Sequence, residues 1–125
     1  MILADTSIWI DHFRSGDNEL IKIIADDLLL CHPAIIGELA LGSLRDRTSV
    51  LAFLNVQREA QVATHDEVMT MIEMHCIFSM GIGYTDAQLL ASVLLDRRTS
   101  LWTRDKRLKV TAEKAGARLY EPLHN

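Results

Sequence analysis

Short apolar runs alternate along the chain with longer segments in which apolar residues recur at helical spacing. The short runs are bounded by polar or turn-forming residues, which is typical of strands in a buried sheet. We predict five strands, at 2–4, 28–31, 60–63, 100–103 and 118–120.

The longer segments predict helices over 18–28, 33–44, 48–56 and 106–115, the last closing at Gly116. Pro33 suits the first position of its helix. In 64–67 and again in 85–88, a Thr is followed three residues later by Glu or Gln, a spacing that favours a capping box at the start of a helix.

Strands that alternate with helices indicate an α/β fold with a parallel sheet covered on both faces and joined by right-handed crossovers. In open sheets of this kind, ligands bind beyond the carboxyl ends of the strands. Asp5 follows the first strand directly, so we expect it to lie at that edge.

The composition fits one compact domain over residues 1–125. Apolar residues make up 49% of the chain, which is enough for a core and argues against disorder. The net charge of −4 excludes a uniformly basic nucleic-acid binder. Cys31 and Cys76 have no zinc-ligand spacing, and we expect two buried reduced thiols. We find no leader sequence and no apolar run that could cross a bilayer, so we expect a cytoplasmic protein with no membrane contact.

Four of the 17 acidic residues are distinguished by their context. Glu38 is the only charge in its predicted helix before Arg45, and a lone carboxylate on an apolar surface is costly unless it is paired or bound to a metal. Asp5 ends an apolar strand. It could cap the next helix, but Thr6 and Ser7 could do so equally well.

Asp86 and Asp105 each have a strong structural explanation, as an acid in a first helical turn and as an N-cap. Asp66 also follows a predicted strand, but the capping box at 64–67 explains it. Taken together, Asp5, Glu38, Asp86 and Asp105 all belong near the same sheet edge.

Converging carboxylates repel one another, and a divalent cation relieves the repulsion. Ligands that are all oxygen suit Mg²⁺ or Mn²⁺ better than zinc. Mg²⁺ keeps several waters, and one of them can act as a nucleophile near neutral pH. Several acids without a nucleophilic triad therefore point to hydrolysis of a phosphodiester.

Four motifs, "DTSIW", "GELALG", "GIGYTDAQLLA" and "LWTRDKRL", occur in this order over almost the whole chain. In these motifs the sequence resembles the PIN-domain ribonucleases, and most closely the VapC-type toxins of bacterial toxin–antitoxin pairs. The resemblance implies a three-layer α/β/α sandwich around a short parallel sheet. It implies that Asp5, Glu38, Asp86 and Asp105 form the catalytic quartet that binds Mg²⁺ or Mn²⁺, with supporting hydroxyls from Thr6, Ser7 or Thr103. It also implies a homodimer and a small antitoxin that shields the acids.

Basic residues cluster between Arg97 and Lys109, where Asp105 is the only acid. Phosphate contacts favour such a patch beside a metal site, and we predict RNA contacts from Arg104, Lys106, Arg107 and, from the helix after Asp5, Arg14. Four of the five Met residues lie in 69–80, where we expect a core helix with a second buried face. We expect His32, His65 and His75 to be structural or exposed.

Two other functions remain open. The first is a non-catalytic RNA-binding domain of the same fold, which would bind RNA without cutting it. The second is a Mg²⁺-dependent phosphoacceptor domain, which ranks lower because "ADTS" supplies one Asp instead of an adjacent pair.

Overall fold

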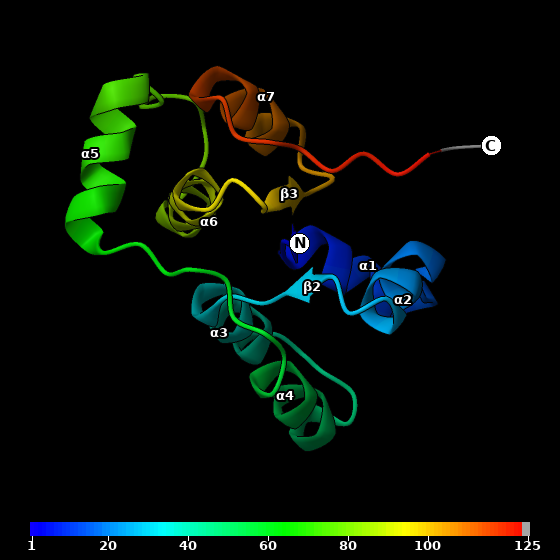
Figure 1. Ribbon diagram of the computed structural model, residues 1–125. Helices are drawn as coiled ribbons and strands as arrows, with labels where there is room; N and C mark the ends of the chain where they lie inside the picture. The colour runs from blue at the N-terminus through cyan, green and yellow to red at the C-terminus, as the bar shows by residue number, and fades with distance from the viewer. Residues whose placement is uncertain (124–125) are drawn as a thin grey trace.

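The computed structural model describes residues 1–123, as a three-stranded parallel sheet surrounded by helices (Figure 1). The strands are β1 (Ile2–Ala4), β2 (Leu29–Leu30) and β3 (Ser100–Trp102), in the order β2-β1-β3. Ile2 pairs with both Leu29 and Ser100, so β1 is the central strand. Its three residues are buried, because helices cover both faces of a parallel sheet.

Two of the five predicted strands do not form; one has a single bridge within it, and the other has a single bridge at the residue before it. Glu59 bridges Cys31 beside β2, and Leu119 bridges Leu101 beside β3. The predicted strands at 60–63 and 118–120 are therefore wrong as strands, although the chain does pass along both sheet edges there. Beyond Tyr120 the pairing cannot continue through Pro122, which has no backbone N–H to donate.

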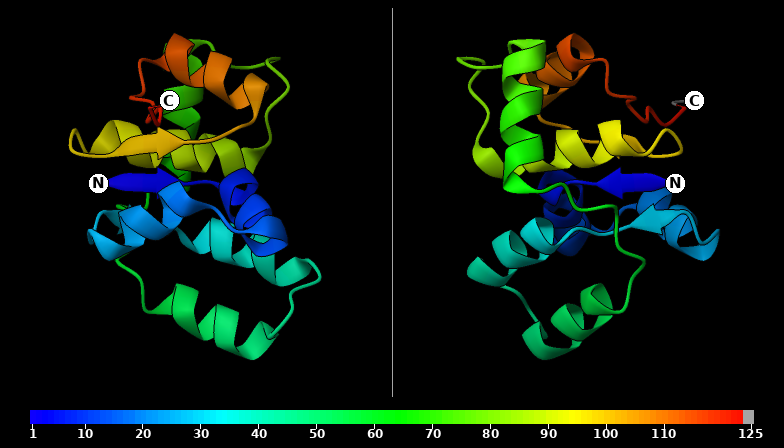
Figure 2. Two further views of the ribbon diagram at one scale, coloured as in Figure 1. Left: turned by 90° about the vertical axis from the view of Figure 1, so that its right-hand side faces the viewer. Right: turned by 60° about the vertical axis from the view of Figure 1, so that its left-hand side comes forward.

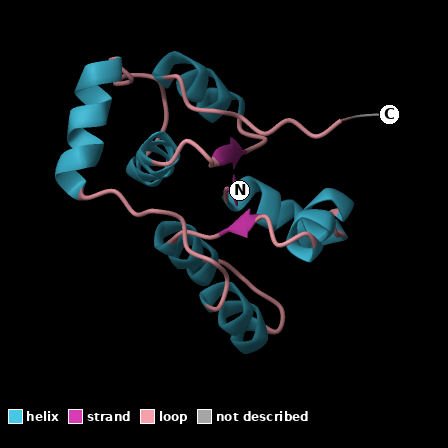
Figure 3. Cartoon of the chain, in the orientation of Figure 1, coloured by secondary structure: helices cyan, strands magenta, loops and turns pink. Residues whose placement is uncertain are grey.

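The helices are α1 (Thr6–Ser15), α2 (Asn18–Ala25), α3 (Pro33–Leu41), α4 (Arg47–Asn55), α5 (His65–His75), α6 (Tyr84–Leu95) and α7 (Lys106–Ala115). Figure 1 shows α1 and α2 on one side of the strands, with α3, α5 and α6 on the other. Helices make up most of the chain and the strands are short (Figure 3). The expected α/β architecture is confirmed.

Helix ends test the capping predictions. The Thr64–Glu67 capping box forms at the start of α5, and Gly116 ends α7 in the left-handed conformation. The capping box predicted at 85–88 is wrong, because α6 begins at Tyr84 and its N-cap Gly83 offers no side chain. Three predicted helices end early: α2 ends at Ala25, α3 at Leu41 and α4 at Asn55.

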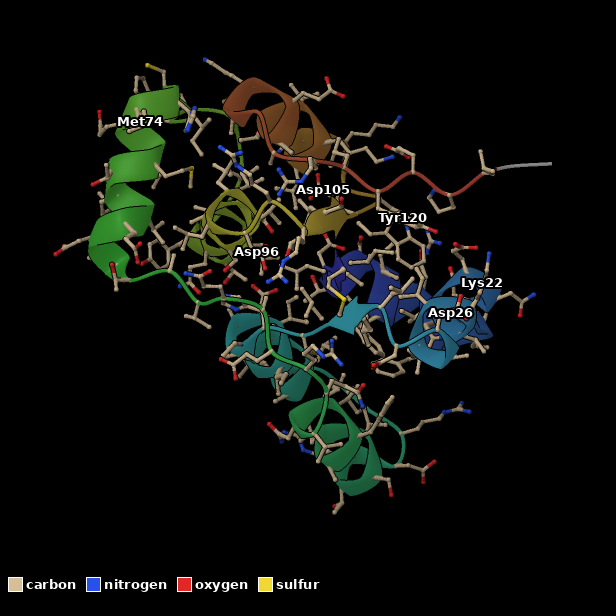
Figure 4. The ribbon with its side chains drawn as sticks, viewed as in Figure 1. Lys22, Asp26, Met74, Asp96, Asp105 and Tyr120 are labelled. Atoms are coloured by element: carbon tan, nitrogen blue, oxygen red, sulfur yellow. The ribbon has the colours of Figure 1, made fainter. Side chains whose placement is uncertain are left out.

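The core joins the sheet to the inner faces of the helices, with Leu3, Ile8, Leu90 and Leu101 fully buried. Tyr120 donates a hydrogen bond to Glu19, which fastens the segment after α7 to α2. Tyr120 and Asp105 are labelled in Figure 4.

The two cysteines and His32 lie in different environments. Cys31 is buried and Cys76 is exposed, and both are free thiols, so the expectation of two buried thiols is wrong for Cys76, which lies at the end of α5. His32 is a buried cap whose Nδ1 accepts from the backbone of Ala34, as a structural histidine should. No helix within residues 1–123 combines the length and the apolar character needed to cross a membrane.

Candidate metal-dependent active site

All four predicted acids line one cavity at the carboxyl ends of the strands. The left-hand view in Figure 2 shows β1 and β3 pointing toward the end of the molecule where α1 and α7 begin. We call this space, of about 420 Å³, the acid cavity. It is lined by Asp5, Thr6, Ser7, Ile10, Glu38, Gly83, Tyr84, Thr85, Asp86 and Asp105.

Asp5 is the most enclosed of the four, with 3% of its surface exposed. Its Oδ1 accepts hydrogen bonds from the backbone and hydroxyl of Ser7, at 3.0 and 2.5 Å, and its Oδ2 accepts from the hydroxyl of Thr103. Burial raises the pKa of Asp5, and these hydrogen bonds act in the opposite direction by stabilising the charged form. Both carboxylate oxygens are thus held in place by side-chain hydroxyls.

Asp5 is also the N-cap of α1, because the same Oδ1 lies 3.4 Å from the backbone nitrogen of Ile8. Thr6 and Ser7 do not replace it in that role: the Ser7 hydroxyl donates to Asp5. Capping and a place in the acid cavity are therefore compatible in one residue.

Asp105 likewise has two roles: it is the N-cap of α7 and it lines the acid cavity. Its Oδ1 accepts from the backbone nitrogens of Arg107 and Leu108, at 2.9 and 3.3 Å. Its own backbone N–H donates to the Thr103 hydroxyl at 3.0 Å, and that hydroxyl donates onward to Asp5. The end of β3 thus connects the two acids through one side chain.

Asp86, in the first turn of α6, lies close enough to the other three acids for their charges to affect its pKa. Burial and the charges of Asp5, Asp105 and Glu38 raise its pKa to about 6. Carboxylates gathered to bind a cation repel one another until the cation neutralises them. The raised pKa of Asp86 therefore supports a cation site.

Glu38 reaches the acid cavity from α3, but it is exposed. The expectation that it lies on a buried apolar surface is wrong. The side of α3 near its C-terminus faces outward, with Leu41 90% exposed, so apolar neighbours in the sequence did not mean a buried environment.

Carboxylates and hydroxyls are the side chains in the lining that can bind a metal, and the lining contains no imidazole and no thiol as far as residues 1–123 show. This donor set fits a hard cation such as Mg²⁺ or Mn²⁺. Within the described part of the chain, no three Asp, Glu, His or Cys side chains are gathered closely enough to hold a metal ion as they stand.

The four basic side chains predicted to bind RNA differ in whether they form ion pairs. Arg104 forms ion pairs with Asp11 and Asp17, and its guanidinium lies 5.5 Å from the ring centroid of Trp102. In the described part of the chain, Arg14, Lys106 and Arg107 form no ion pair. Arg14 lines a neighbouring cavity that shares Ile10 and Glu38 with the acid cavity.

Tyr84, which was not among the predicted site residues, lines the acid cavity and hydrogen-bonds to His65. A usable signal was present, because Tyr84 stands two residues before Asp86 and therefore in the same helical turn.

The Met-rich segment is partly as expected. Met71 packs in the core, whereas Met69 and Met74 are 43% and 70% exposed. In Figure 4, Met74 lies on α5, well away from Asp105.

Comparison with known proteins gives two concordant results. The PIN domain family matches residues 2–114. Two relatives, each named Ribonuclease VapC32, come from Mycobacterium tuberculosis strains CDC 1551 / Oshkosh and ATCC 25618 / H37Rv. Each is 46% identical over 121 residues, covering 97% of this chain and 98% of the relative.

Proposed function

The chain belongs to the PIN-domain family, in its VapC branch, and we propose that it is a Mg²⁺- or Mn²⁺-dependent endoribonuclease that acts as the toxin of a toxin–antitoxin pair. The observation that carries the proposal is the meeting of Asp5, Glu38, Asp86 and Asp105 around one cavity. The relatives named as ribonucleases support RNA as the substrate.

The four carboxylates would hold the cation, and Asp5 would be the best-ordered ligand because hydroxyls fix both of its oxygens. When bound, the cation would supply charge neutralisation at the scissile phosphate and activation of water. Repulsion at Asp86 supports this role, since a cation would relieve it.

The chain's own groups would position the reaction. Asp5 and Asp105 would orient the attacking water, while Ser7 and Thr103 keep the Asp5 carboxylate from rotating. Water would form a bond to phosphorus as the bond from phosphorus to the 3′ oxygen breaks. The products would be a 5′-phosphate and a 3′-hydroxyl.

RNA backbone contacts would come from Lys106, Arg107 and Arg14. Arg104 is a weaker candidate, because its charge is already shared between Asp11 and Asp17. These contacts would position the phosphodiester without reading its sequence.

We further propose a single domain over residues 1–125, a homodimer, a cytoplasmic location and a cognate antitoxin that covers the acid cavity. The VapC branch supports the antitoxin, and the net charge of −4 favours basic groups on the partner where it meets the acids.

The decisive experiment compares wild type with Asp5→Asn and Glu38→Gln on single-stranded cellular RNA, with Mg²⁺ or with EDTA. We expect cleavage only by wild type with the metal present, leaving 5′-phosphate ends. Asp66→Asn is the matched control, because Asp66 is an acid in a first helical turn outside the acid cavity, and it should cleave normally.

Cleavage by Asp5→Asn at the wild-type rate would refute the assignment. RNA binding by wild type without cleavage would instead indicate the non-catalytic RNA-binding alternative. A base-labile acyl-phosphate on Asp5 would indicate the phosphoacceptor alternative.

A further inference from the structure

Tyr84 is the only aromatic residue in the lining of the acid cavity, as far as residues 1–123 show. It is the first residue of α6, and Asp86 follows in the same turn. Tyr84 is 44% exposed, so a large part of its surface is open to solvent at the mouth of a cavity lined by four acids. An exposed aromatic ring at such a place needs an explanation, because burial does not account for it.

The ring of Tyr84 is held by a residue from another helix. Its hydroxyl lies 2.6 Å from Nδ1 of His65, the first residue of α5, and the two rings are 5.6 Å apart at their centroids. His65 is itself exposed, so this contact fixes the ring without burying it. A fixed aromatic face loses little conformational entropy when a flat ligand packs on it.

A cationic side chain lies along the segment that leads to Tyr84. The side chain of Arg107 packs against Gly81, so closely that a Cβ added at Gly81 would lie 3.1 Å from Arg107 Cδ. Gly81 has a φ of +79°, which other residues rarely adopt. Arg107 is therefore placed close to the start of α6, and it forms no ion pair in the described chain.

An aromatic face, a nearby arginine and a set of carboxylates suit one kind of ligand. Carboxylates repel phosphates, so RNA needs other attractions near the cavity. A nucleobase stacks on an aromatic ring whatever its identity, and arginine binds the adjoining phosphate. The base must be unpaired, because bases within an A-form duplex are stacked on each other and cannot present a face.

From this arrangement we propose that Tyr84 is the stacking platform for one unpaired nucleobase beside the scissile phosphodiester, with Arg107 on the neighbouring phosphate. This inference rests on the proposed ribonuclease function and adds a residue that positions the RNA at the acid cavity.

The test measures binding of a fluorescent, mixed-sequence, single-stranded RNA of about 12 nucleotides, which covers the site of a typical single-strand binder. The full-length chain carries Glu38→Gln throughout, so that the probe is not cut. Tyr84→Leu removes the ring, Tyr84→Phe keeps it, and Phe78→Leu removes an exposed aromatic residue that does not line the acid cavity. Circular dichroism and thermal melting check that each variant is folded.

We expect Tyr84→Leu to weaken binding by roughly 5- to 150-fold, the range measured for loss of one stacked base. Tyr84→Phe should weaken binding far less, and Phe78→Leu should leave it unchanged. A second series places an abasic nucleotide at each position of the probe. We expect one position at which the abasic site weakens binding to the chain with Tyr84 and to the Tyr84→Phe variant. At that position it should cause no further loss of binding in Tyr84→Leu, because the ring is already absent.

Equal binding by the Tyr84→Leu variant and its parent chain, or additive losses at every abasic position, would overturn the inference. The original chain with Glu38 intact is assayed for cleavage in parallel. Cleavage by that chain together with unchanged binding by Tyr84→Leu would refute only the stacking role. Failure of that chain to cleave or bind any RNA would refute the proposed function itself.

Discussion

Arg104 and Asp17 form an ion pair, with 2.5 Å between Nη2 and Oδ2, that joins the segment between β3 and α7 to the N-cap of α2. The same guanidinium pairs with Asp11 of α1 at 2.9 Å, and the Arg104 backbone N–H donates to Ser7. A residue predicted to contact RNA thus also ties the segment after β3 to α1 and to the start of α2.

We expect Arg104→Ala to lower the free energy of unfolding by about 1 kcal/mol, because the ion pairs are partly exposed and screened. Burial would raise the pKa of Asp17, but its hydrogen bonds with Arg104 and Leu20 outweigh that effect and lower it. The contribution of Asp17 to the stability of the fold is therefore complete above its usual pKa of 3.8 and is lost as pH falls further. Urea unfolding of wild type and Arg104→Ala should give curves that converge at low pH, and a constant difference would contradict this role.

Thr103→Val should reduce cleavage by about 10- to 100-fold, the usual cost of removing a group that orients a metal ligand. The change keeps the shape of the side chain but removes the hydroxyl that donates to Asp5 and accepts from the Asp105 backbone. Thr103→Ser keeps the hydroxyl and should retain most of the activity. Steady-state cleavage kinetics at matched Mg²⁺ measure the effect, and full activity in Thr103→Val would show that the hydroxyl is dispensable.

Variants at Asp5 should separate its two roles. Asp5→Asn keeps a side-chain oxygen for the α1 cap, so it should abolish cleavage with a small change in stability. Asp5→Ala should be inactive and also less stable than Asp5→Asn by about 1 kcal/mol, the usual cost of losing an N-cap. Thermal unfolding without divalent metal gives the comparison, and equal stability of the two variants would mean that capping by Asp5 contributes nothing.

The raised pKa of Asp86 predicts a pH dependence of stability in the metal-free protein. The folded chain holds this proton up to about pH 6, whereas the unfolded chain releases it near the usual value of 3.8. The stabilising contribution is therefore complete below pH 3.8, declines as the pH rises from there, and is lost once the pH has passed about 6. In EDTA, the free energy of unfolding of wild type should fall by on the order of 1 kcal/mol between pH 3.8 and about 6, and Asp86→Asn should remove this decline. An unchanged decline in the variant would place the titration elsewhere.

Divalent cations should reverse the loss of stability that accompanies ionisation of Asp86. At neutral pH, Mn²⁺ at about 100 times its dissociation constant should stabilise wild type by about 2.7 kcal/mol. Glu38→Gln and Asp86→Asn should gain much less, and Asp66→Asn should gain as much as wild type. Differential scanning calorimetry with and without EDTA measures these shifts, and equal gains in all variants would place the cation outside the acid cavity.

The order of apolar and polar segments was enough to predict β1, β3 and the meeting of four acids, because the carboxyl ends of parallel strands share one edge. It was not enough for contacts that depend on how helices approach one another. The pairing of His65 with Tyr84 joins residues 19 positions apart on two helices, and that of Arg104 with Asp17 joins residues 87 apart. Apolar neighbours in the sequence of Glu38 could not show that its side of α3 faces solvent.

The central place of β1 has a consequence for the synthesis of the protein. Asp5 leaves the ribosome before the hydroxyl that holds its Oδ2, which comes from a residue 98 positions later, directly after the strand that completes the sheet beside β1. A nascent chain that ends after α5 has Asp5 and Glu38 without Asp86 or Asp105. If it is the toxin proposed above, the cell meets an assembled nuclease only after β3 and the start of α7 have been synthesised.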